Sequence, residues 1–138
     1  MPQLRQITPP APVATGPQFS APEIQAMQRA VLQLGQRWEL TDDQLAVLLG
    51  DISVRTLQRW KQGQYGRPGV DACARMSNLL GIHKALRLLF REATRGYGWI
   101  RRANTVFGGQ SALDVMLGGQ LTDLMRVRRY LDTVRAPW

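Results

Sequence analysis

The sequence has few of the residues that build metal centres, nucleophilic triads and disulfides. Its 138 residues include one cysteine and one histidine. Cys73 has no second cysteine to pair with, and His83 has no second ligand nearby with which to hold a metal ion or complete a triad. We therefore expect no disulfide, no metal site, no cofactor and no enzymatic activity. Cys73 is expected to act as a small hydrophobic residue, and His83 to lie at the surface or at a helix boundary.

Long apolar runs are also missing. No stretch approaches about eighteen consecutive apolar residues, so we expect no membrane-spanning segment. The N-terminus lacks the apolar run of a signal peptide, and the single cysteine cannot form an internal disulfide, so we expect a cytoplasmic protein. Residues 1–18 instead hold five of the eight prolines and almost no charge, which predicts a flexible proline-rich arm. A proline-rich ligand is the alternative interpretation.

Acidic residues are outnumbered by basic ones. The chain has 18 Lys and Arg against 10 Asp and Glu, for a net charge of +8, and 16 of those 18 are arginine. Between residues 53 and 102, eleven side chains are basic and two are acidic. Arginine favours planar, two-point contacts with phosphate or carboxylate groups. Nucleic acid or an acidic protein surface is therefore the expected partner, and a solvated basic surface is the alternative.

Apolar periodicity predicts an all-α fold. Ser20 and Glu23 have the spacing of a capping box, and a helix is expected to start there. Its apolar residues recur at helical spacing and are interpreted as core rather than as a seam between helices: Ile24, Met27, Val31, Leu34 and Trp38. Residues 70–91 are dense in apolar residues and are expected to form two helices, joined at Gly81, at the centre of the fold.

Residues 41–63 have the spacing of a helix-turn-helix unit. Thr41 caps a short helix, Gly50 turns the chain, and Ser53 caps a second helix whose Leu57 and Trp60 face inward. The outward residues of this second helix are the candidate DNA contacts: Arg55, Thr56, Gln58, Arg59 and Lys61. We expect Arg55, Gln58 and Arg59 in the groove and Lys61 at a phosphate. The unit resembles the Xre-type DNA-binding unit, with Gln44, Ala46, Gly50, Thr56 and Trp60 at its characteristic places. A structural three-helix unit is the alternative.

Two glycine pairs, residues 108–109 and 118–119, bracket a short helix near the C-terminus. Both pairs are expected to supply backbone at positive φ. Ser111 and Asp114 form a capping box for the short helix, which gives Asp114 a structural rather than a catalytic role. A longer helix follows, with Leu121, Leu124, Val127 and Leu131 on one face. The chain ends in a tail over residues 135–138, whose terminal aromatic residue is expected to be received by a partner.

Residues 99–138 resemble the toxin-binding domain of the Xre/MbcA/ParS antitoxins. The matching positions occur in order along this segment: Trp99, Arg101, Asn104, Phe107 to Gly109, Ser111 to Asp114, Met116, Gly118, Asp123, Leu124, Val127, Arg128, Tyr130 to Asp132 and Trp138. Two positions depart from the pattern. Ala103 stands where a proline often precedes the asparagine, and Ala136 with Pro137 stands where a glycine pair often precedes the final tryptophan.

This resemblance implies an antitoxin of a bacterial type II toxin–antitoxin system. It implies an Xre-like helical domain over residues 19–92 and a toxin-binding domain over residues 93–138. The implied partners are a RES-domain toxin, which consumes or transfers parts of NAD, and operator DNA of the protein's own promoter. The antitoxin is expected as a homodimer within a hetero-oligomeric complex.

The resemblance also points to the residues that would meet the toxin. These are Trp99, Arg101, Asn104, Phe107, Gly108, Gly109, Ser111, Arg128, Arg135 and Trp138. The tail is expected to occlude the toxin's NAD pocket, with Arg135 at sites that normally meet the NAD phosphates and Trp138 as an aromatic plug. One alternative is that Trp138 folds back on its own helix. Another is a plain helix-turn-helix repressor that dimerises through the apolar face of the last helix.

Overall fold

The computed structural model describes residues 19–135, and this part of the chain confirms the all-α prediction. It contains no strand, only an isolated bridge between Ala103 and Ser111. The elements, in order, are α1 (Ala21–Arg37), α2 (Asp42–Leu48), α3 (Val54–Lys61), α4 (Val70–Leu89), α5 (Ala93–Trp99), the 3-10 turn η1 (Thr105–Phe107), α6 (Ala112–Met116) and α7 (Leu121–Arg135). Within this part of the chain, no helix is long and apolar enough to cross a membrane.

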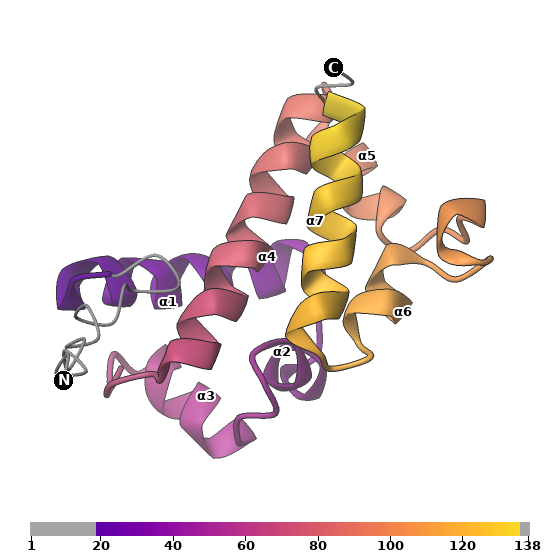
Figure 1. Cartoon of the computed structure of the whole chain (residues 1–138). Helices are drawn as coiled ribbons and strands as arrows, with labels where there is room; N and C mark the ends of the chain where they lie inside the picture. The colour runs from indigo at the N-terminus through magenta and orange to yellow at the C-terminus, as the bar shows by residue number, and fades with distance from the viewer. Residues whose placement is uncertain (1–18, 136–138) are drawn as a thin grey trace, which may run out of the picture.

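The long helix α4 is the centre of the molecule. It contacts α1, α5 and α7, and α7 runs beside it for most of its length (Figure 1). The helices α2 and α3 lie together at the foot of α4, and α6 packs against the far side of α7. The proposed division at residue 92 separates α4 from α7, yet these two helices form the most extensive helix pair of the fold.

One continuous core joins these helices. It includes Val31, Leu34 and Trp38 of the first predicted stripe, all at most 1% exposed, while Ile24 and Met27 are partly buried and pack against it, which confirms the interpretation of that stripe as core. Leu124, Val127 and Leu131 of α7 are at most 2% exposed and belong to the same core. Cys73 is also buried, as expected of a small hydrophobic residue, and burial raises the pKa of its thiol.

The prediction of two helices joined at Gly81 is wrong, because α4 passes through this residue without a break. The glycine instead makes room for a neighbouring side chain. A Cβ atom at position 81 would lie 2.6 Å from Cζ of Arg128, which reaches over from α7. The prediction that His83 lies at the surface or at a helix boundary is corrected as well, because this residue is in the interior of α4.

The two glycine pairs do not behave alike. Gly108, Gly109 and Gly119 have φ angles of 65°, 91° and 86°, as expected for positive-φ positions. Gly118 does not share this conformation, which corrects the prediction for that residue. It is a site of close approach, because a Cβ atom there would lie 2.6 Å from an oxygen of Asp123.

The turn between α2 and α3 depends on Gly50. This residue has a φ angle of 95°, and a Cβ atom there would lie 2.8 Å from an oxygen of Asp71 and 3.0 Å from Nε of Arg75. Arg75 is 8% exposed and is held between Asp71, at 2.8 Å, and the carbonyl oxygen of Gly119, at 2.9 Å. Glycine therefore serves both the turn and the packing of α4 beside it.

We expect Gly50→Ala to lower the free energy of unfolding by more than about 1 kcal/mol, since it adds backbone strain and displaces the buried Arg75 side chain from its contact with the exposed Asp71 carboxylate. Gly63→Ala is the matched control. Its φ angle is 83°, but a Cβ atom there would meet nothing within 4 Å, so the variant isolates the cost of the backbone conformation. Urea unfolding measures both. Equal losses for the two variants would show that the contact with Arg75 contributes nothing.

Candidate functional site

The helix α3 is fixed by its cap and by its buried face. The Ser53 side chain accepts a hydrogen bond from the backbone N–H of Thr56 at 3.0 Å, as predicted, and Leu57 and Trp60 are 0% and 4% exposed. Capping and burial together leave the opposite face of α3 at the surface. A short helix presented in this way is what major-groove recognition requires.

The structure separates the five candidate DNA contacts into two sets. Arg55 and Arg59 are exposed, and neither is in an ion pair within residues 19–135. Thr56 is partly covered and shares a 2.8 Å hydrogen bond with the hydroxyl of Ser53. Gln58 and Lys61 are exposed but both contact Asp42 of α2 at 2.7 Å. Of the five, only the two arginines therefore reach solvent without a partner in the described chain.

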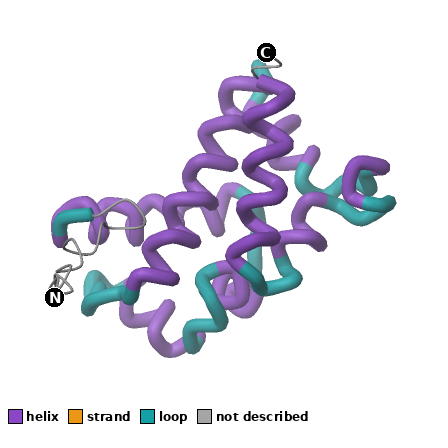
Figure 2. The backbone as a smooth tube through the Cα atoms, viewed as in Figure 1, coloured by secondary structure: helices purple, strands orange, loops and turns teal. Residues whose placement is uncertain are grey.

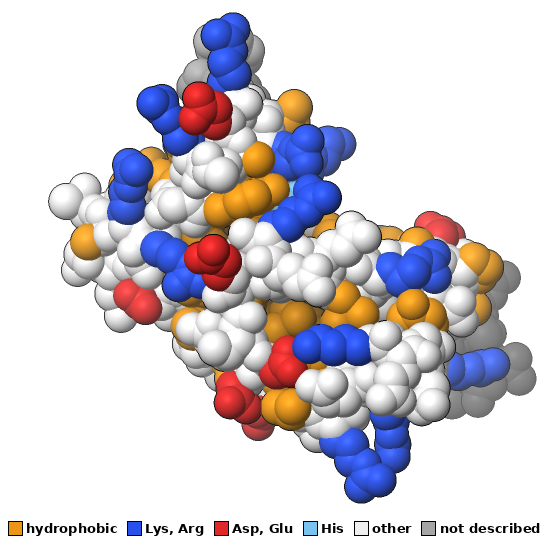
Figure 3. All heavy atoms as spheres, turned by 180° about the vertical axis from the view of Figure 1, so that it is seen from behind, with side chains coloured by type: hydrophobic (Ala, Val, Ile, Leu, Met, Phe, Trp, Pro, Cys, Tyr) orange, Lys and Arg blue, Asp and Glu red, His pale blue; other side chains and the backbone are white. Residues whose placement is uncertain are grey.

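The basic residues do not form one face. Arg55, Arg59, Lys61 and Arg67 lie on α3 and in the loop after it, whereas Lys84, Arg87, Arg91 and Arg95 lie at the far end of α4 and beyond. At 1.5 Å per residue, the α4 segment from Val70 to Arg87 is about 25 Å long. Figure 3 shows basic side chains projecting from the lower edge, where Figure 1 places α3, and others gathered at the upper end. Phosphate contacts by α3 would use only the first group.

Residues 104–110 form a closed loop. Asn104 holds it together, since its side-chain oxygen accepts from the N–H of Val106 at 3.0 Å, and its backbone bonds to Phe107, Gly109 and Gln110 at 2.9 to 3.0 Å. Gly108 and Gly109 turn the chain in the left-handed region, and a Cβ atom at either position would meet nothing within 4 Å. Figure 2 shows this segment as irregular backbone on either side of a single helical turn. The loop therefore has its own internal hydrogen bonds and projects small residues and backbone outward.

An aromatic cluster fixes the loop to α5 and α7. Phe107 is 2% exposed and meets Tyr130 edge-on at 5.5 Å between ring centroids, and Trp99 stacks on Tyr130 at 6.1 Å. Arg126 covers the other side, with Cζ 5.4 Å from the centre of the Phe107 ring. Arg126 was missed at the sequence level because it lies 19 positions from Phe107 and has no local motif with it.

Several candidate toxin contacts have roles inside the fold. Arg101 donates to the carbonyl oxygens of Trp38 and Glu39, at 2.7 and 2.9 Å, and so satisfies the C-terminal end of α1. Ser111 is 7% exposed and caps α6 by accepting from the N–H of Asp114 at 3.0 Å, as predicted. These contacts within the fold are enough to account for Arg101 and Ser111 at their positions. That either side chain also contacts the toxin stays a prediction.

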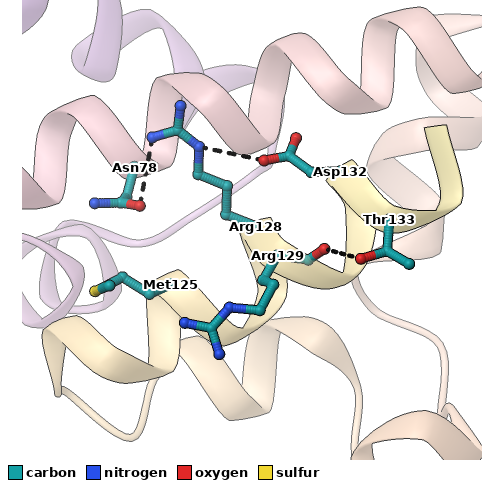
Figure 4. Close-up of a pocket in the computed structure, with 6 residues that line it drawn as sticks. All are labelled: Asn78, Met125, Arg128, Arg129, Asp132 and Thr133. Atoms are coloured by element: carbon teal, nitrogen blue, oxygen red, sulfur yellow. Dashed lines mark hydrogen bonds and ion pairs between the residues drawn. The ribbon is translucent and has the colours of Figure 1, made fainter. Parts of the chain in front are cut away.

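Arg128 lies in a polar groove of about 430 Å³ between α4 and α7 (Figure 4). Its guanidinium is 3.4 Å from the side-chain oxygen of Asn78 and 3.9 Å from a carboxylate oxygen of Asp132. In Figure 4 the side chain of Arg129 points away from this pair. The contacts tie α7 to α4, and the exposed Arg129 and Met125 beside them leave the groove accessible.

A second cleft lies near the end of α7. It has a volume of about 230 Å³ and only apolar and aromatic walls: Leu89, Phe90, Trp99, Tyr130, Leu131 and Val134. Arg135 is the last residue of α7 and not part of a bare tail, and its guanidinium is 3.6 Å from Asp132. Trp138 lies outside the described residues. The cleft therefore lies beside the point where the described chain ends.

His83 joins three helices. Its Nδ1 accepts a hydrogen bond from Nε1 of Trp38 at 3.2 Å, and its ring stacks on Tyr97 of α5 at 5.6 Å between centroids. Burial lowers the pKa of His83, and the positive charges of Arg37 and Arg87 lower it further. Within residues 19–135 no three potential metal ligands lie together. His83 is therefore a packing residue that is held neutral.

We expect stability to depend on pH through His83. In the unfolded chain its pKa is about 6.5, so on lowering the pH the unfolded state takes up the proton first and the folded state loses stability. This loss begins below about pH 6.5 and ends once the pH has passed the lower folded-state pKa. Urea unfolding of the wild type and His83→Gln from about pH 8 to about pH 5 measures it. The variant should lack this loss. If the free energy of unfolding falls equally steeply with decreasing pH in both proteins, His83 is not responsible for the loss.

Comparisons with known proteins agree with this architecture. Residues 25–81 match the antitoxin Xre-like helix-turn-helix domain, and residues 85–136 match the antitoxin Xre/MbcA/ParS C-terminal toxin-binding domain. The chain is also 40% identical over 121 residues to a protein of Sinorhizobium fredii (strain NBRC 101917 / NGR234) named "Uncharacterized protein y4oB", covering 88% of this chain and 93% of the relative. With these matches in this order, the chain belongs to the Xre/MbcA/ParS antitoxins.

Proposed function

We propose that this antitoxin neutralises a RES-domain toxin that consumes NAD, and that it represses its own operon by binding operator DNA. The observation that carries the first part is the toxin-binding domain match, which runs to residue 136 and includes the closed loop and the cleft at the end of α7. The tail that follows would enter the NAD pocket of the toxin. Binding there excludes the substrate, so inhibition needs no chemistry from the antitoxin.

The proposed toxin surface has the features of a protein interface. The loop exposes Val106, which is 49% accessible, next to the backbone of Gly108 and Gly109. Trp99 and Tyr130 line the cleft, and aromatic side chains in clefts are common anchors of protein complexes. Arg135 and Trp138 are the proposed tail contacts. Because Arg135 pairs only with exposed Asp132 in the described chain, exchanging this pair for a toxin contact costs little.

The proposed DNA surface is the outer face of α3. Arg55, Gln58 and Arg59 are the proposed groove contacts, with Thr56 and Lys61 beside them. The recognition helix of one chain reads only a few base pairs, so a homodimer on two half-sites is proposed. The apolar face of α7 is not proposed as the homodimer interface, because Leu124, Val127 and Leu131 are buried against the rest of the same chain. This burial also weakens the alternative of a plain repressor that dimerises through that face.

The test is genetic and does not require the operator sequence. The reading frame adjacent to this gene is expressed alone and together with the antitoxin. We expect growth arrest and NAD loss in the first case and normal growth in the second. If neighbouring frames are harmless when expressed alone, or remain toxic in the presence of this protein, the antitoxin role toward them is refuted.

A further inference from the structure

Asp42 links the two helices of the helix-turn-helix unit through a pair of short contacts. It is the first residue of α2, and its carboxylate reaches across to the outer face of α3. One oxygen lies 2.7 Å from Nε2 of Gln58 and the other 2.7 Å from Nζ of Lys61. The partners are 16 and 19 positions away in sequence, so no local pattern reveals the arrangement.

The contact determines how the Gln58 side chain is turned. An ionised carboxylate only accepts hydrogen bonds, so the amide nitrogen of Gln58, and not its oxygen, must face Asp42. One of the two amide hydrogens is used there. The other amide hydrogen remains free as a donor, and Oε1 remains free as an acceptor. This pair matches the major-groove edge of adenine, which offers the N7 acceptor and the N6 donor.

The same carboxylate changes what Lys61 does. Its ammonium group is paired with Asp42, and the two side chains are 41% and 34% exposed. A lysine held in this pair loses part of its attraction for a phosphate, because the neighbouring negative charge opposes the approach of a second one. Sequence-independent binding by α3 is therefore reduced by about one phosphate contact.

We propose that Asp42 is a positioning residue for DNA recognition: it aims Gln58 at an adenine in the major groove and keeps Lys61 from binding phosphate. The inference rests on the proposed DNA-binding function of α3. Asp42 itself touches no base. Its effect on specificity passes through Gln58, and its effect on salt dependence passes through Lys61.

The experiment selects bound sequences from a random duplex DNA library with the full-length protein and its variants. The wild type should enrich an adenine in each half-site, with a preference on the order of tenfold. Gln58→Ala should remove this preference at that position alone, and Asp42→Ala should reduce it to about the same level. Asp43→Ala is the matched control, since it removes the same charge from the same exposed turn of α2. It should keep the preference.

Salt dependence and a conservative variant separate positioning from a change in charge. Asp42→Ala should steepen the slope of log affinity against log salt by about 0.9, because Lys61 becomes free to bind a phosphate. Asp42→Asn removes the charge and offers Gln58 a donor as well as an acceptor, so it should recover only part of the adenine preference while keeping the steeper slope.

Two results overturn the inference alone. One is an unchanged adenine preference in Asp42→Ala, and the other is an equal loss of preference in Asp42→Ala and Asp43→Ala. If the folded wild type enriches no sequence and binds no duplex, the proposed DNA-binding function itself fails, and the inference fails with it.

Discussion

Replacing Trp60 with alanine is expected to lower the free energy of unfolding by about 3–5 kcal/mol. The side chain is 4% exposed and belongs to the core that holds α3 against its neighbours. Removing it leaves a cavity that this small fold can only partly fill. Because small domains have total stabilities of about 5–15 kcal/mol, a large part of the protein should be unfolded under mild denaturing conditions. Urea unfolding followed by circular dichroism measures the change.

Arg55→Ala on the same helix is the control. Arg55 is exposed and lies on the opposite side of α3 from the core, so this variant should change stability by no more than about 0.5 kcal/mol while it weakens DNA binding. A Trp60→Ala protein that unfolds like the wild type but no longer binds DNA would place Trp60 at the DNA surface and not in the core.

Ending the chain at Arg135 is expected to weaken neutralisation of the toxin on the order of thirtyfold, since an aromatic anchor in a pocket commonly contributes about 2 kcal/mol or more. Arg135 is kept in the truncated chain because it completes α7 and pairs with Asp132. The helix α7 ends at Arg135, so the truncation removes no residue of a described helix. Promoter binding and thermal stability should therefore hardly change.

The full-length Trp138→Ala variant is the control for chain length. It should lose most of the same inhibition if the aromatic plug is responsible, and the truncated protein should still bind the toxin through the loop of residues 104–110. Complete inhibition by the truncated protein would show that the tail is dispensable and that the loop, or the fold as a whole, blocks the toxin.

Local sequence signals predicted the helix starts well, because a cap is made by residues close in sequence. Ser20 and Ser111 form the predicted capping boxes, and Thr41 and Ser53 cap α2 and α3 as predicted. The apolar stripe of α1 was also readable, since burial on one face leaves a regular spacing. These local features were sufficient to predict the all-α fold and the helix-turn-helix unit without any tertiary contact.

Features that depend on contacts between residues far apart in sequence could not be predicted. Gly81 resembles a helix break, but tertiary packing explains it, because Arg128 occupies the space where its side chain would be. The helix α5 was not predicted, since Gly96 and Gly98 weaken its helical pattern. Gly96 is buried, and a Cβ atom there would lie 3.3 Å from Leu86 of α4. In both places a glycine serves close packing and not a turn.

The candidate sites were predicted as residue sets but not as geometry. The family motif singles out Asn104, Phe107 and Arg101, and the structure gives each of them a contact that maintains the fold. A motif therefore does not distinguish a residue that builds a surface from one that touches the partner. Asp42 was missed for the converse reason, because its importance depends only on contacts with α3.

The most direct test of the central claim is NAD consumption by the purified toxin in the presence of a saturating amount of the full-length antitoxin. We expect NAD loss to fall to the level measured without toxin, and the truncated chain ending at Arg135 to leave measurable consumption. A stable complex in which the toxin consumes NAD at its full rate would contradict the claim that this protein neutralises its partner by occupying the active site.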